Sequence, residues 1–176
     1  MILYVVRHAL AEDAAPGGDD ARHLTDIGRQ RTQKAAAGMR ALALEFDVIL
    51  TSPLARAAET AAIIAEAYEN TPAPRILEEL STGVPPIEAI AALAPFGRDE
   101  SVMIVGHEPQ LSALIAILLT GEPDGMHLRT RKGACVALDL PAKRIEPGAA
   151  ELLWMMTQRQ LRQLRKKRSH RRSASS

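Results

Sequence analysis

The stretch ILYVVRH, residues 2–8, decides the fold. Its first five residues, Ile2–Val6, are apolar and rich in β-formers, which is typical of a short strand buried on both faces. Arg7 and His8 follow at once. A histidine held at the end of a rigid strand suits catalysis, although a lone histidine there is explained equally well as a core or turn residue.

Beyond residue 8, predicted strands and helices alternate along the chain. Further short apolar runs with strand character span 47–50, 75–77, 102–105, 133–140 and 149–156. Helices are predicted over 26–44, 54–69, 86–94 and 110–119. Thr25 is a plausible cap for the first of these helices, and Pro53 stands near the start of the second. This alternation predicts an α/β sandwich with a largely parallel sheet.

Three of the predicted strands are followed directly by polar or charged residues that could take part in catalysis or binding. These residues are Arg7-His8, Thr51-Ser52 and Gly106-His107. Ligands of such sheets collect at the carboxyl ends of the strands, so these groups are expected to converge. Arg56 lies near the start of helix 54–69, where free backbone N–H groups and a guanidinium both favour an anion.

Each of these features has an ordinary structural explanation when taken alone, but together they indicate a small cationic pocket. Two adjacent guanidinium groups would repel a divalent cation, so no metal is expected there. The sequence has no HExxH motif or cysteine cluster that would offer another metal site. It also has no Walker A or GxGxxG loop. An anion is therefore the expected ligand.

The charge is unevenly distributed along the chain. Residues 159–172 hold eight of the 22 Lys and Arg residues and none of the 21 acidic ones, so the preceding residues carry a net charge of −7. We therefore expect a globular domain over 1–157 and a basic, flexible tail over 158–176. The tail is either a solvated terminus or a contact for an acidic partner.

Composition narrows the setting further. The single cysteine, Cys135, excludes an internal disulfide and favours a reducing cytoplasm. The start of the chain does not look like a signal peptide, and no apolar run approaches the roughly 20 residues that a membrane span needs. Aromatic residues make up only 3%, which argues against base-stacking platforms for single-stranded nucleic acid.

These motifs and their order resemble the histidine phosphatase superfamily, also called the phosphoglycerate-mutase-like superfamily. The residues that carry the resemblance are RH (7–8), RHLTDIG (22–28), TSPLARAAET (51–60) and GHEP (106–109). The short length and the spacing most resemble the SixA-type phosphohistidine phosphatases. The resemblance covers roughly residues 1–157 and implies a three-layer α/β/α sandwich with a mostly parallel central sheet. One departure is Ala9, where the family usually has glycine; a positive φ there would strain the site.

The resemblance also implies roles for site residues. His8 would be the nucleophile that forms a covalent phosphohistidine. Arg7, Arg56 and His107 would bind the phosphoryl oxygens together with it, and no metal or other cofactor would be required. Glu79 stands in the region of the family's general acid. Other carboxylates remain open for that role: Glu12, Asp13 and Glu108.

A phosphohistidine on a signalling or phosphotransfer protein is the expected substrate. Its imidazole is a good leaving group, and the short loop after Leu80 implies an open pocket that fits a protein. The alternatives are a small phosphomonoester, a phosphotyrosine or phosphoserine protein, or a non-catalytic phosphate-binding module.

Overall fold

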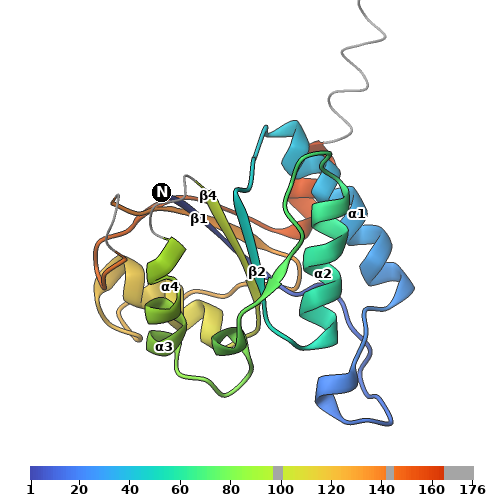
Figure 1. Ribbon diagram of the computed structural model, residues 1–176, viewed down its shortest axis with the longest axis horizontal. Helices are drawn as coiled ribbons and strands as arrows, with labels where there is room; N and C mark the ends of the chain where they lie inside the picture. The colour runs from blue at the N-terminus through green and yellow to red at the C-terminus, as the bar shows by residue number, and fades with distance from the viewer. Residues whose placement is uncertain (97–100, 142–144, 165–176) are drawn as a thin grey trace, which may run out of the picture.

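The computed structural model describes residues 1–96, 101–141 and 145–164 and contains one six-stranded sheet (Figure 1). The strands are β1 (Ile2–Arg7), β2 (Val48–Thr51), β3 (Arg75–Ile76), β4 (Ser101–Gly106), β5 (Cys135–Asp139) and β6 (Glu151–Met156). Their order across the sheet is β3-β2-β4-β1-β5-β6. The four strands β3, β2, β4 and β1 run parallel, and β5 and β6 add antiparallel pairs at one side. The expected mostly parallel sheet is confirmed.

Helices cover both faces of this sheet and make it the middle of three layers. The helices are α1 (Asp26–Ala41), α2 (Ala55–Glu66), α3 (Pro86–Ala92) and α4 (Gln110–Thr120). Side chains of β1 alternate between the layers: Leu3 and Val5 pack with residues of α3 and α4, and Tyr4 and Val6 pack with residues of α1 and α2. Figure 1 shows the two helix pairs on opposite sides of the strands. The three-layer α/β/α sandwich is confirmed.

Helix α1 begins where the sequence predicts, but it ends three residues earlier. The Thr25 hydroxyl accepts a hydrogen bond from the Gly28 N–H at 3.0 Å and caps the helix. Gly28 is required there, because a Cβ atom at this position would lie 2.0 Å from the Leu10 carbonyl oxygen. At the other end the chain turns through Ala43, with φ of 55°, which brings Leu44 and Phe46 into the core.

The first residues of the predicted basic tail pack against the domain. Residues 158–164 are helical, and Leu161 is fully buried in the core cluster that includes Ala35 and Met39 of α1. A Cβ atom on Gly38 would lie 1.9 Å from the Leu161 carbonyl oxygen, so the two backbones are in direct contact. The packed structure thus continues past residue 157. The rest of the tail, 165–176, lies outside the described residues.

Among the described residues, no helix combines the length and the apolar character that crossing a membrane requires.

Candidate active site

The predicted strand-end residues come together at the carboxyl edge of the sheet. Arg7 and Gly106 are register partners in the pairing of β1 with β4, and the His8 N–H donates to the Gly106 carbonyl at 3.0 Å. Ser52, directly after β2, donates its N–H to the Val105 carbonyl at 3.0 Å. These pairings bring the His8 and His107 rings to a centroid separation of 5.1 Å.

His8 is buried and held as a neutral ring. Its Nδ1 atom lies 2.8 Å from the Ala9 carbonyl oxygen. A carbonyl only accepts, so Nδ1 carries the hydrogen and Nε2 keeps a free lone pair. Burial lowers the pKa of His8 to about 4, and the positive charges of Arg56, Arg7 and Lys132 act in the same direction. The ring is therefore neutral at neutral pH, and its Nε2 lone pair is suited to nucleophilic attack.

His107 is held by Ser52. Its Nε2 atom lies 2.8 Å from the Ser52 hydroxyl oxygen. That oxygen accepts a hydrogen bond from the Leu54 N–H at 3.3 Å. Burial lowers the pKa of His107 to about 3, with His8 and the two arginines adding to the shift. Its Nδ1 atom is buried and has no hydrogen-bond partner within the described part of the chain. Such a group is suited to contact a polar atom of a ligand.

The two arginines approach from different elements. Arg56 lies in the first turn of α2 with only 3% of its surface exposed. Its NH1 and NH2 atoms donate to Asp19, at 2.6 Å to the carbonyl and 2.8 Å to the carboxylate Oδ2. Arg7 donates from NH1 to the Thr130 carbonyl at 2.9 Å, and its Nε is buried without a partner among the described residues. Both guanidinium groups lie close enough to depress the pKa values of the two histidines.

The departure at Ala9 does not strain the backbone. Among the described non-glycine residues, only Ala43 has a positive φ. Ala9 is fully buried, and its N–H donates to the Thr60 hydroxyl at 3.1 Å. That hydroxyl in turn donates to the Arg56 carbonyl at 2.7 Å. Ala9 thereby connects the segment that follows His8 to α2, the helix that carries Arg56.

The candidate acids differ in their surroundings. Glu79 lies in the short 3-10 turn Glu78–Leu80 after β3, where Gln110 Nε2 donates to its backbone carbonyl at 2.7 Å. Within the described residues, no hydrogen bond or ion pair joins the Glu79 carboxylate to the histidines and arginines of the site. Glu79 therefore stays a prediction.

The other carboxylates lie on both sides of the site. Glu108 accepts from the Ser112 hydroxyl at 2.8 Å. Burial lowers the pKa of the Arg7 guanidinium, and the negative charge of Glu108 opposes that shift, which makes Glu108 an electrostatic neighbour of Arg7. The Glu12 carboxylate instead accepts from the His23 N–H at 3.1 Å. Asp13 is exposed.

Two contacts of the site were not anticipated. Ser52 was expected at a strand end but without a partner, yet its hydroxyl oxygen lies 2.8 Å from Nε2 of His107. No role was predicted for Asp19, yet its carboxylate contacts Arg56, 37 residues away. The strand-end position of Ser52 was a usable signal. No local pattern pairs Asp19 with Arg56.

The grouping of potential metal ligands can be checked within the described residues. Within 1–96, 101–141 and 145–164, no group of three or more His, Cys, Asp or Glu side chains is arranged to hold a metal ion.

The sequence of this chain matches a known family and known proteins. The family model of the histidine phosphatase superfamily (branch 1) matches residues 3–83. An uncharacterised protein of Picosynechococcus sp. (strain PCC 7002) is 34% identical over 164 residues, which span 89% of this chain and 96% of the relative. The phosphohistidine phosphatase SixA of Escherichia coli K12 is 28% identical over 161 residues, with 89% and 94% covered.

Solved structures agree on the fold. The protein histidine phosphatase SixA complexed with tungstate superposes with a TM-score of 0.81 at 23% identity, over 92% of this chain and 99% of that one. An alpha-ribazole-5'-P phosphatase structure from E. coli K-12 superposes with a TM-score of 0.72 at 21% identity, with 90% and 97% covered. The fold, the matched family model and the relative at 34% identity together establish that this chain belongs to the histidine phosphatase superfamily and is a phosphatase.

Proposed function

We propose that this phosphatase works through a covalent phosphohistidine on Nε2 of His8 and needs no metal ion. The observation that carries this proposal is the state of the ring: Nδ1 is held by the Ala9 carbonyl, and burial keeps Nε2 unprotonated at neutral pH. That nitrogen is a free nucleophile at the end of a rigid strand.

The reaction has two steps. First, Nε2 of His8 attacks phosphorus, the bond from phosphorus to the leaving group breaks, and the leaving group takes a proton from solvent or from a carboxylic acid near the site. Second, water attacks the phosphohistidine, which releases inorganic phosphate and restores the neutral ring. Arg7, Arg56 and His107 bind the phosphoryl oxygens and stabilise the charge of both transition states. Since phosphoryl transfer depends mainly on positioning and charge neutralisation, these four side chains suffice without a metal.

We propose a phosphohistidine on a protein as the substrate. An imidazole leaves phosphorus readily once it is protonated, so this substrate depends less on a general acid than an alkyl phosphate does. Glu79, which has no contact with the site histidines and arginines, is then needed less. The 28% identity to a phosphohistidine phosphatase supports the same substrate class.

A small phosphomonoester is the second candidate, favoured by the shared fold with an alpha-ribazole-5'-P phosphatase. For that substrate a proton donor is required, and Glu79 and Glu108 are the candidates to test.

The deciding experiment traps the intermediate. Wild type, His8→Ala and the matched control His127→Ala, which alters an exposed histidine, are mixed with a ³²P-labelled phosphohistidine peptide and with an aryl phosphate, both in EDTA. We expect wild type and His127→Ala to carry an alkali-stable, acid-labile label. We expect His8→Ala to carry none and to lose turnover by three orders of magnitude or more.

The same experiment can refute the mechanism. A label that survives in His8→Ala would assign the nucleophile to another residue, and loss of wild-type turnover in EDTA would contradict the metal-free site. The ratio of the two wild-type rates decides between the substrate classes. Phosphate binding without any turnover would favour a binding module.

A further inference from the structure

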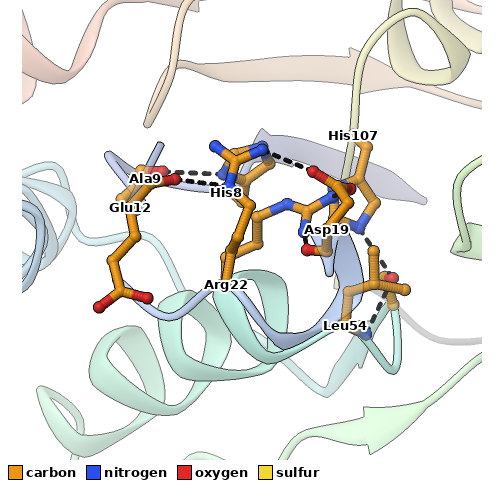
Figure 2. A network of polar contacts seen from close by, with 9 residues as sticks. His8, Ala9, Glu12, Asp19, Arg22, Leu54 and His107 are labelled. Atoms are coloured by element: carbon orange, nitrogen blue, oxygen red, sulfur yellow. Dashed lines mark hydrogen bonds and ion pairs between the residues drawn. The ribbon is translucent and has the colours of Figure 1, made fainter. Parts of the chain in front are cut away.

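An acidic side chain of the protein lies directly on the arginine assigned to phosphate. Asp19 stands in the short 3-10 turn Asp19–Ala21, between β1 and α1. Its carbonyl and its Oδ2 atom accept from the two terminal nitrogens of Arg56, and its Oδ1 atom lies 2.6 Å from NH1 of Arg22. The carboxylate thus bridges two arginines. Figure 2 shows Asp19 between Arg22 and His107.

The loop that carries Asp19 is fixed at its base and exposed at its tip. At the base, Ala11 and Leu24 form a β-bridge, and the Leu24 N–H donates to the Glu59 carboxylate of α2 at 2.8 Å. At the tip, residues 16–20 are all exposed, and the Asp19 side chain is 57% exposed. Arg56 by contrast is buried in its helix. Asp19 can therefore leave Arg56 without unfolding the base of the loop.

Asp19 and a phosphoryl group would require the same donors. A guanidinium presents a planar fork that a carboxylate and a phosphoryl group match equally well. The negative charge of Asp19 also acts on His107, where it opposes the fall in pKa that burial causes. A second anion at this place meets both an occupied fork and a like charge. Only the fraction of molecules in which Asp19 has left Arg56 is then competent to bind it.

We propose that Asp19 is a built-in competitor for the phosphate site, which must leave Arg56 before a phosphoryl group binds and returns when the product departs. Apparent affinity falls in proportion to the competent fraction, so every small anion binds more weakly than the bare pocket would allow. Free inorganic phosphate, which is also the product, therefore does not hold the site. This inference rests on the proposed function only in assigning Arg56 to the phosphoryl group.

The test compares two neighbouring carboxylates. Asp19→Asn removes the charge and keeps the size, Asp19→Ala removes the side-chain acceptor as well, and the exposed Asp20→Asn makes the same change of charge one residue away. Inorganic phosphate is titrated into each purified protein by calorimetry. Its inhibition constant, kcat and KM are measured with an aryl phosphate, and thermal unfolding confirms that each variant is folded.

We expect both Asp19 variants to bind phosphate about five- to tenfold more tightly than wild type, as suits the loss of one charge pair at a half-exposed site. KM should fall by a similar factor, kcat should stay or fall slightly as product leaves more slowly, and Asp20→Asn should change neither constant by more than about twofold.

Two results would overturn the inference. Phosphate affinity that is the same in the Asp19 variants and Asp20→Asn would show that Asp19 does not compete. A kcat reduced more than tenfold at unchanged phosphate affinity would make Asp19 a proton donor instead. Because calorimetry needs no turnover, a wild type that is inert on all substrates would refute the proposed function and still leave this comparison decisive.

Discussion

The two ends of the parallel strands differ in what they hold: the amino end has a surface cleft, and the carboxyl end has a cluster of buried titratable and charged side chains. At the amino end, a cleft of about 410 Å³ is lined by Arg40, Glu45, Asp47 and Tyr68 among others. At the carboxyl end lie His8, His107 and Arg56, each less than a tenth exposed. Charged and titratable groups are costly to bury, so a protein that buries several together uses them. This contrast favours the carboxyl end as the candidate active site, although the cleft lies at the amino end.

The largest difference between the ends should appear when one arginine is removed from each. Arg56→Gln deletes a donor to the phosphoryl group and should lower kcat/KM by about 10²- to 10³-fold. Arg40→Gln changes an exposed arginine of the amino-end cleft and should alter kcat/KM by less than about twofold. Steady-state kinetics on one phosphorylated substrate measures both. Equal losses would mean that the amino-end cleft belongs to the active site.

The buried histidines should also make stability depend on pH. Each ring takes up a proton near pH 6.5 in the unfolded chain, but only near about 4 (His8) or about 3 (His107) in the folded one. From pH 6.5 down to about 4 the unfolded chain therefore binds more protons. As the pH is lowered through this range, the free energy of unfolding should decrease by about 1.4 kcal/mol per pH unit for each ring.

Urea unfolding between pH 7 and pH 4.5 measures this slope, with His8→Asn as the comparison. Removing one ring should reduce the slope by the share of one proton. A variant with the wild-type slope would show that His8 is not held neutral by the fold, and would weaken the contrast between the two ends.

The smallest effect on activity is expected at the amino end, where the polar contacts stabilise the fold and take no part in the reaction. The Asp47 Oδ2 atom accepts from the Ser101 N–H at 2.8 Å and lies 3.1 Å from its hydroxyl, joining the starts of β2 and β4. Asp47→Ala should lower the free energy of unfolding by about 1–2 kcal/mol and leave kcat/KM unchanged. Glu45→Ala, an exposed change in the same cleft, should stay within about 0.5 kcal/mol. A loss of activity in Asp47→Ala would contradict the division of roles.

Much of the fold was predictable because its signals are local. Buried strands appear as unbroken apolar runs in a sequence. The run 102–105 therefore predicted a strand, and the structure has β4 there, over Ser101–Gly106. The convergence of His8 and His107 followed from the same reasoning, since parallel strands bring their carboxyl ends to one edge. Helix ends were less predictable. The turn at Ala43 brings Leu44 and Phe46 into a core cluster that includes residues far along the chain, such as Met103.

What could not be predicted depends on partners far along the chain. Leu161 lies in a basic segment with few apolar residues, so the sequence gives little sign that its side chain is buried. Its burial depends on Gly38, which lets the backbone at Leu161 approach α1 closely. The order of the strands, with antiparallel β5 beside β1, has no local signature either. The contact of Asp19 with Arg56 requires a loop to pack against α2, with both α1 and β2 intervening along the chain.

The position of β1 between β4 and β5 has a consequence for how the protein forms. β1 leaves the ribosome before both of its partners, which are residues 101–106 and 135–139. Contacts at such separation slow folding, because a long loop must close before they stabilise anything. During synthesis β1 has no strand partner until residues 101–106 have emerged. Until then its apolar side chains are open to aggregation or to binding by a chaperone.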